Sequence, residues 1–282
     1  MLLLQSNDSN FKTQFDELLR RGHMDMENVS KIVSGIITEI KGEGNGALKR
    51  HIEKFDKWHV ENDASLEVST DAMKTAYDAL EPKLKVALEL AYKRIYAYHE
   101  KLMPKSWLDF EDNGNVLGQK VTPVDRAGLY IPGGKAAYPS SLLMNAIPAL
   151  VAGVKEIVVC TPAPEGELNP LLLAAMHLCG IQKAYKVGGA SAIAAMAYGT
   201  QSIPKVDVIT GPGNIFVATA KKLVFGEVNI DMIAGPSEIG ILADESANAH
   251  HLAIDLLSQA EHDEMASSIL ITPSLALAEK TR

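Results

Sequence analysis

The run Glu156-Ile157-Val158-Val159-Cys160 is a β-strand pattern, because apolar residues follow one another without the polar alternation of a half-exposed strand. Similar runs recur along the chain and alternate with helical segments. The expected strands are Leu129–Pro132, Glu156–Cys160, Lys183–Val187 and Val206–Thr210, and the expected helices cover Ser140–Val154 and Pro170–Cys179 and begin at Ala190 and Asn214. Continuous apolar strands joined by crossover helices predict a parallel sheet that is covered on both faces.

The segments on either side of this pattern differ from it. Residues 1–104 read as a helical leader, in which Val33, Ile36, Ile37 and Ile40 recur at helical spacing. Its single histidines, among them His51, are interpreted as surface or interhelical residues. After the sheet, a Gly235-Pro236 turn between two strand-like runs suggests a hairpin, and a helix, the strand Ser268–Thr272 and an unfinished helix follow. We therefore expect three regions: a helical region at 1–104, a Rossmann-like nucleotide-binding domain at 105–233, and the start of a second α/β domain at 234–282.

The composition predicts a soluble cytoplasmic protein without a nucleic-acid partner. The chain has 282 residues and a net charge of -8, and its basic residues are scattered; Lys221-Lys222 reads as a short exposed pair. Cys160 and Cys179 make no disulfide framework, which fits a reducing compartment. The apolar start Met1–Leu4 is too short for a signal sequence, and no apolar run reaches the length of a membrane span.

Three glycine-rich turns follow expected strands, and they indicate a ligand crevice. They are Pro132-Gly133-Gly134, Gly188-Gly189-Ala190 and Gly211-Pro212-Gly213-Asn214. Such turns at the carboxyl ends of parallel strands let the backbone approach a ligand and direct helix N-terminal amides at an anion. None has the G-x-G-x-x-G pattern, so any nucleotide site is of another kind. The alternative interpretation is that glycine simply fits tight turns between strand and helix.

Gln259 and His262 lie three residues apart on the helix expected after the Asn229–Asp244 stretch, so both side chains can leave one face. An amide oxygen and a ring nitrogen can share a divalent metal such as zinc, although a solvated polar face is the ordinary alternative. The adjacent His250 and His251 point in different directions and read as solvated. Neither Cys160 nor Cys179 has a local cationic partner, so both are interpreted as buried, inert thiols.

Several long runs resemble the histidinol dehydrogenase family, and together they cover nearly the whole chain. The resemblance implies an α/β fold in which the helical leader is followed by Rossmann-like, aldehyde-dehydrogenase-like parallel sheet domains, incomplete at the C-terminus. It also implies a cytoplasmic enzyme that oxidises L-histidinol to L-histidine through the aldehyde with Zn2+ and two NAD, and a homodimer whose active site borrows residues from the partner's C-terminal region. The runs are Val124–Gly134 (VDRAGLYIPGG), Tyr138–Val154 (YPSSLLMNAIPALVAGV), Val187-Gly188-Gly189-Ala190, Thr210–Asn214 (TGPGN), Ala234–Glu238 (AGPSE), Asp255–His262 (DLLSQAEH) and, in the leader, Lys54-Phe55-Asp56.

The resemblance also assigns roles to individual residues. Gln259 and His262 match zinc ligands that contact the substrate, and Ser237 matches a further substrate contact. Tyr130 and Asn214 match NAD contacts. Ser191 stands where the family usually has a Gln that makes a third NAD contact, and the shorter side chain lacks the amide.

The family's acid–base pair and the remaining zinc ligands match no residue up to Arg282, so the resemblance implies no catalytic residue in this chain and no activity of the chain alone. Two alternatives stay open. One is a non-catalytic fragment that binds a nucleotide or dimerises. The other is an aldehyde dehydrogenase-like enzyme that uses a reactive cysteine, for which neither cysteine qualifies.

Overall fold

The computed structural model describes residues 2–20, 26–133, 138–233, 238–261 and 266–282. The chain divides into two compact units. The larger unit comprises Glu27–Ala234, and the smaller unit combines Met1–Met26 with Gly235–Arg282. The three-part division expected from the sequence stays a prediction.

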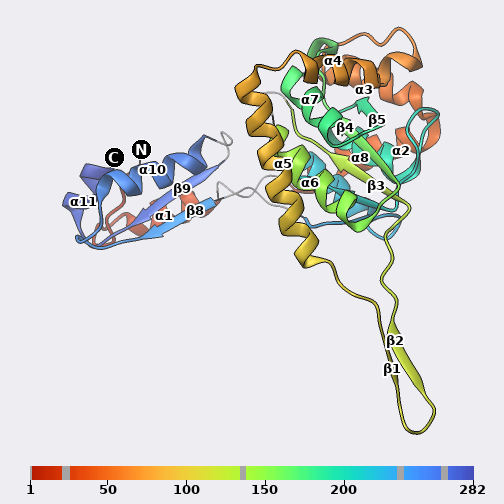
Figure 1. Cartoon of the computed structure of the whole chain (residues 1–282). Coiled ribbons are helices and arrows are strands. Elements are labelled where there is room, and N and C mark those ends of the chain that lie inside the picture. Colours follow the sequence, from red (N-terminus) through yellow and green to blue (C-terminus); the bar gives the residue numbers. More distant parts are fainter. Residues whose placement is uncertain (1, 21–25, 134–137, 234–237, 262–265) are drawn as a thin grey trace. The chain divides into compact units, whose positions relative to one another are not determined.

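The larger unit is built on a five-stranded parallel sheet, which confirms the expected α/β class (Figure 1). The strand order is β5-β4-β3-β6-β7. The central strand, β3, is therefore the first strand of this sheet along the chain. The last strand, β7, lies in the first of the two strand-like runs expected around Gly235-Pro236; it is very short and pairs in parallel with β6. The strands are β3 (Arg126–Tyr130), β4 (Glu156–Thr161), β5 (Lys183–Lys186), β6 (Val208–Thr210) and β7 (Asn229–Ile230).

Each face of the sheet has its own apolar core, because successive side chains of a strand point to opposite faces. In β3, Tyr130 belongs to one buried cluster and Leu129 to the other; in β4, Cys160 and Val159 divide in the same way. The crossover helices that cover the two faces are α6 (Pro139–Ala152), α7 (Pro170–Leu178), α8 (Gly189–Tyr198) and α9 (Ile215–Val224), with a short 3-10 helix at Pro164–Gly166.

The helical leader contributes to both cores. Ile40 and Leu48 are buried in the same cluster as Tyr130, whereas Met73 and Leu88 are buried with Leu129. The leader therefore covers the sheet from both sides and belongs to one unit with it. Its helices are α2 (Met26–Glu43), α3 (Asn45–Phe55), α4 (Thr70–Asp78) and α5 (Pro82–Leu102), with a short 3-10 helix at Asp63–Leu66.

A β-hairpin that the sequence pattern did not reveal follows the leader. It pairs β1 (Trp107–Phe110) with β2 (Val116–Gln119) in antiparallel fashion, and every residue of both strands is exposed (Figure 1). The register puts Phe110 opposite Val116 and Leu108 opposite Gly118. Because facing residues share one side of a ribbon, the hairpin has one apolar face.

The smaller unit contains a two-stranded parallel sheet, in which β8 (Glu238–Leu242) pairs with β9 (Ser267–Ile271). The hairpin expected around Gly235-Pro236 is therefore wrong: β7 pairs with β6 and β8 pairs with β9. Residues 234–237 themselves lie outside the described part. The helices of this unit are α1 (Phe11–Arg20), α10 (Ala249–Ala260) and α11 (Leu275–Thr281).

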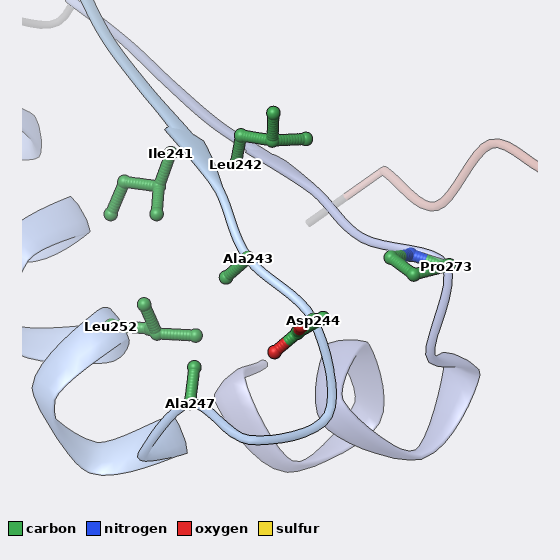
Figure 2. Close-up of a pocket in the computed structure, with 7 residues that line it drawn as sticks. All are labelled: Ile241, Leu242, Ala243, Asp244, Ala247, Leu252 and Pro273. Atoms are coloured by element: carbon green, nitrogen blue, oxygen red, sulfur yellow. The ribbon is translucent and has the colours of Figure 1, made fainter.

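A pocket of about 570 Å³ opens at the end of β8 in the smaller unit (Figure 2). Leu242, Leu252 and Pro273 contribute to its mainly apolar wall, and Asp244 is its charged residue. The Asp244 carboxylate already accepts hydrogen bonds from the backbone N–H and the hydroxyl of Ser246. Of the residues that the sequence assigned a role, none that the structure describes lines this pocket. Within the described ranges, no helix is long and apolar enough to cross a membrane.

Candidate functional site

The strand order creates a switch point at β3. The chain runs from β3 to β4 and β5 on one side of the sheet, and then returns to β6 and β7 on the other. In open parallel sheets, ligands bind outside the carboxyl ends of the strands where the order reverses in this way. Tyr130 ends β3, and the turn Gly211–Asn214 follows β6. The topology thus brings Tyr130 and the Gly211–Asn214 turn, both predicted to contact NAD, to the same edge of the sheet.

Close backbone packing explains the glycines at this edge. Gly211 has a φ of 122°, and a Cβ there would collide with the carbonyl oxygen of Tyr130. A Cβ on Gly188 would lie 2.5 Å from the Cβ of Pro162, and one on Gly133 would lie 3.0 Å from its Cγ. The turns that contain Gly133 and Gly188 therefore both pack against Pro162. The turn that contains Gly211 packs against the end of β3. Only glycine fits such approaches without displacing backbone.

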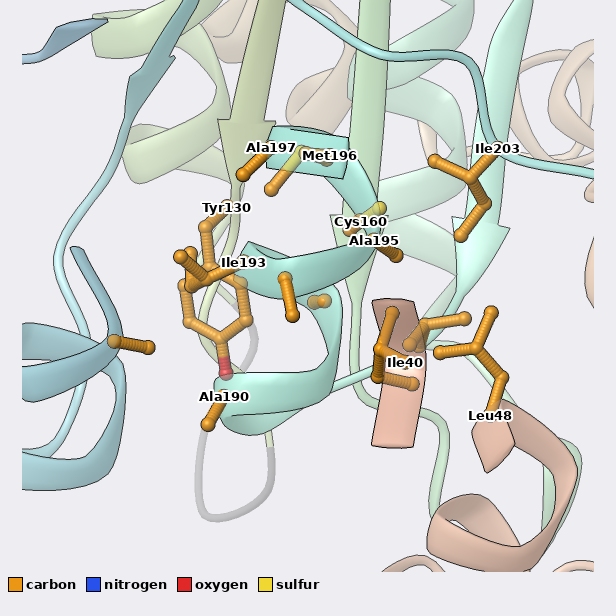
Figure 3. Close-up of a cluster of buried hydrophobic side chains, with 14 of the residues drawn as sticks. Ile40, Leu48, Tyr130, Cys160, Ala190, Ile193, Ala195, Met196, Ala197 and Ile203 are labelled. Atoms are coloured by element: carbon orange, nitrogen blue, oxygen red, sulfur yellow. The ribbon is translucent and has the colours of Figure 1, made fainter. Parts of the chain in front are cut away.

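Tyr130 is buried, and its ring lies beside the start of α8 (Figure 3). The Tyr130 hydroxyl accepts a hydrogen bond of 3.1 Å from the backbone N–H of Gly189. Burial raises the pKa of this hydroxyl to about 12, and the nearby Asp56 carboxylate adds to the effect, while the Gly189 N–H opposes it. The phenol therefore stays protonated at neutral pH and can donate its proton to a ligand.

Asp56 is a residue at this edge to which sequence reasoning assigned no role. It ends α3 as its C-cap, and its backbone carbonyl accepts a hydrogen bond of 2.9 Å from Glu165. Burial raises the pKa of the Asp56 carboxyl, and a hydrogen bond from the Ala163 N–H acts against that rise. The only sequence signal was its place in the run Lys54-Phe55-Asp56. This partly buried carboxylate acts electrostatically on the Tyr130 hydroxyl, whose pKa it raises.

The Ser191 hydroxyl is held inside the protein. Ser191 is 4% exposed, and its Oγ lies 2.9 Å from Nδ1 of His51, which is 8% exposed. The other ring nitrogen of His51 lies 3.0 Å from a carboxylate oxygen of Glu39. A single internal partner thus occupies the hydroxyl that was assigned to NAD. The expectation that His51 lies between helices is correct, since it joins α3 to α8.

Asn214 is the N-cap of α9. Its Oδ1 accepts hydrogen bonds from the backbone N–H groups of Phe216 (3.1 Å) and Val217 (3.2 Å). This cap explains why the helix begins directly after the turn. The side chain is exposed, and because the cap uses its oxygen, a contact with a ligand falls to the amide nitrogen.

The structure brings only part of the expected metal site into view. Gln259 lies in the last turn of α10, which ends at Ala260 with Glu261 as its C-cap. His262 and Ser237 lie outside the described residues, so their roles and the helical spacing of Gln259 and His262 stay predictions. The amide nitrogen of Gln259 is buried without a hydrogen-bond partner in the described part of the chain. Such an unsatisfied amide fits a site that another polar group completes.

No cluster of three or more His, Cys, Asp or Glu side chains suited to a metal occurs among the described residues. His250 and His251, at the start of α10, are both exposed, as expected. Both cysteines are buried. Burial raises the pKa of the Cys160 thiol strongly and that of the Cys179 thiol to about 12, so neither provides a thiolate nucleophile.

This geometry defines a class of protein: an open parallel α/β protein whose strand order reverses at β3, the place where proteins of this fold bind their ligands. The chain belongs to the histidinol dehydrogenase family, whose model matches residues 19–282. It is 70% identical over 279 residues to histidinol dehydrogenase from Sulfurimonas denitrificans, covering 99% of this chain and 65% of that protein. Its identity to the Wolinella succinogenes enzyme of the same name is 68% over 276 residues, covering 98% of this chain and 64% of that protein.

The fold agrees with a solved structure from the same family. The crystal structure of histidinol dehydrogenase from Elizabethkingia anophelis matches with a TM-score of 0.80 at 38% identity, covering 92% of this chain and 59% of that chain. The chain thus spans about 65% of the length of the curated relatives that it matches.

Proposed function

We propose that the complete protein is a zinc- and NAD-dependent histidinol dehydrogenase of cytoplasmic histidine biosynthesis, which oxidises L-histidinol to L-histidine through the aldehyde. Family membership over residues 19–282 carries this proposal. Relatives of that name at 70% and 68% identity support it. Because the chain spans about 65% of their length, the activity is proposed for the complete protein and not for this chain alone.

The NAD contacts are proposed at the switch point of the larger unit. Tyr130 would donate its protonated hydroxyl, and Asn214 its amide nitrogen. The N-terminal amides of α8 and α9 begin at the turns after β5 and β6, where they can favour the cofactor's diphosphate. Ser191 is the least supported of the three proposed contacts, because His51 already occupies its hydroxyl.

The metal and substrate contacts are proposed for the smaller unit. Gln259 would supply an amide oxygen and His262 a ring nitrogen to zinc, and Ser237 would contact L-histidinol. Zinc, when bound, would hold the substrate's amino and imidazole nitrogens and so fix the carbon that loses hydride. The Gln259 amide nitrogen, buried without a partner among the described residues, is a donor, so it supports a hydrogen-bond acceptor beside the proposed metal and not the metal itself.

A second candidate applies to the chain by itself. It is a non-catalytic fragment that binds NAD weakly, because every proposed NAD contact lies in the larger unit, which has its own cores. The cysteine-dependent alternative has less support, since both thiols are buried.

Enzyme assays on two forms of the protein test the proposal. A form extended to the full length of the relatives should reduce NAD in the presence of L-histidinol, followed by NADH absorbance. The 282-residue chain should not, because the family's acid–base pair matches none of its residues. An extended form that binds zinc but leaves L-histidinol untouched would contradict the proposed activity. Turnover by the chain alone would place the base within residues 1–282.

We also propose that the complete enzyme is a homodimer and that the second copy covers the apolar face of the β1–β2 hairpin. An isolated two-stranded ribbon is only marginally stable in water, so a covering partner would stabilise it. Its exposed tip carries Glu111 and Asp112, while the exposed side of α5 carries Lys93, Arg94 and Lys101 beside one acid, Glu100, so basic charge is in excess there. This charge complementarity supports docking of the hairpin on α5 of the partner subunit.

A further inference from the structure

Lys221 is a buried charge that the proposed function does not use. The sequence placed it in an exposed pair, which is wrong for Lys221: it is 2% exposed, whereas Lys222 is exposed. Its Nζ donates a hydrogen bond of 3.0 Å to the carbonyl oxygen of Gly211 and forms an ion pair with Asp231. A buried ammonium is costly unless its hydrogen bonds and charge are satisfied, so these partners require an explanation.

Asp231 completes the arrangement around the same glycine. It follows β7, and its Oδ2 accepts a hydrogen bond of 2.9 Å from the N–H of Gly211. Its Oδ1, which pairs with Lys221, also accepts a hydrogen bond of 2.6 Å from the N–H of Met232. Both polar backbone groups of Gly211 are therefore bound by the Lys221–Asp231 pair. On its other side, Gly211 presses against the backbone of Tyr130.

Stability alone does not account for this pair. Lys221 is buried whereas the Asp231 side chain is 31% exposed, so the attraction of a partly solvated carboxylate returns only part of the cost of removing the lysine charge from water. A lysine that served only to neutralise Asp231 would need no contact with the turn. Here the lysine and the aspartate each bind a different polar group of one glycine, three residues before Asn214.

We infer that Lys221 and Asp231 are positioning residues for the dinucleotide: they fix the Gly211–Asn214 turn between β6 and α9, so that Tyr130 and Asn214 face the cofactor. The inference rests on the proposed NAD site. Neither residue needs to touch NAD, because each acts through the backbone of Gly211. The same pair anchors Met232, just before the chain leaves the larger unit at Ala234.

Four variants of the 282-residue chain test the inference: Lys221→Met, Asp231→Asn, the double variant, and Lys222→Met as the control with the same charge change. Each single variant should lower the melting temperature, because one buried polar group loses its partner. The double variant leaves no unpaired charge, so it should melt no lower than the single variants, although the Gly211 carbonyl oxygen still lacks its donor. Its NAD affinity in calorimetry should nevertheless fall about tenfold, since the turn is no longer fixed. Lys222→Met should change neither quantity.

A measurement without NAD tests whether the ion pair fixes the turn, independently of whether the proposed NAD site exists. Backbone amide NMR without NAD should show shifted resonances for Gly211 and faster hydrogen exchange across the turn in the double variant, and an unchanged Gly211 resonance in Lys222→Met. If the wild type binds no NAD although these changes occur, the proposed NAD site fails and the fixing of the turn stands. A double variant with native Gly211 resonances, or with wild-type NAD affinity, would overturn the inference.

Discussion

Gly211 adopts a backbone conformation that a side chain would disrupt in two ways, by its positive φ and by collision with Tyr130. We predict that Gly211→Ala destabilises the larger unit by more than about 3 kcal/mol in urea unfolding. Gly226 provides the matched control, because its φ of 101° is also positive while a Cβ there would meet no heavy atom within 4 Å. Gly226→Ala should cost only about 1–2 kcal/mol. Equal losses in the two variants would show that contact with Tyr130 is not tight.

Asn214 has a structural role and a proposed binding role, which a matched cap can separate. Asn214→Ala should cost about 1 kcal/mol of stability through loss of the α9 cap, and NAD affinity should fall several-fold. Asn169 caps α7 in the same way, with its Oδ1 accepting from the N–H of Leu171. Asn169→Ala should therefore show a similar stability loss with unchanged NAD binding in calorimetry. If both variants bind NAD equally well, Asn214 is only a cap.

The position of a side chain could be predicted where a local sequence pattern determines the secondary structure. Its burial could not be predicted where contacts with residues distant in the sequence determine it. Tyr130 could be placed in a strand before a turn because an apolar run followed by glycines specifies this order, although β3 ends at Tyr130 and not at Pro132 as expected. The burial of Lys221 could not be foreseen, because its partners Gly211 and Asp231 come from other segments. His51 is a similar case, since it meets Ser191 far along the chain.

The same distinction between local patterns and distant contacts applies to whole helices and strands. The strands β3 to β6 and their helices were predicted within a few residues, because burial on both faces produces continuous apolar runs. The β1–β2 hairpin went unnoticed, since each strand has only four residues and neither WLDF nor VLGQ alternates polar and apolar residues. The expected hairpin at Gly235-Pro236 was wrong, because a local turn signal does not show which distant strand each run joins.

The hairpin's exposed apolar face leads to a prediction about association. In the extended protein, Phe110→Glu should convert a dimer into monomers in sedimentation experiments, because Phe110 is 72% exposed and would place a charge in the proposed interface. Gln119→Glu adds the same charge on the opposite face of the ribbon, as the register places Gln119 across from Trp107. That variant should remain dimeric. A dimer that tolerates Phe110→Glu would exclude this face from the interface.

At the scale of the whole molecule, the metal content of the chain by itself can be predicted. We expect the 282-residue chain to lack tightly bound zinc after dialysis, because Gln259 and His262 are only two of the ligands that the family resemblance implies. Two ligands provide a fraction of the binding free energy of a complete tetrahedral site. Elemental analysis should find well under one zinc per chain, and the extended form should retain the metal. About one zinc on the chain alone would show that other ligands lie within it.

The smaller unit joins the first residues of the chain to those after 234, and this has a consequence for biosynthesis. A ribosome adds roughly 5–20 residues per second, so α1 emerges some tens of seconds or less before its companions α10 and α11 exist. During that interval the larger unit can fold, whereas α1 has its half-buried apolar side chains, Phe11 and Leu18, without their native surroundings. We therefore expect the nascent chain to depend on chaperones at its beginning, and a circular permutant that makes residues 235–282 and 1–26 contiguous should escape that dependence.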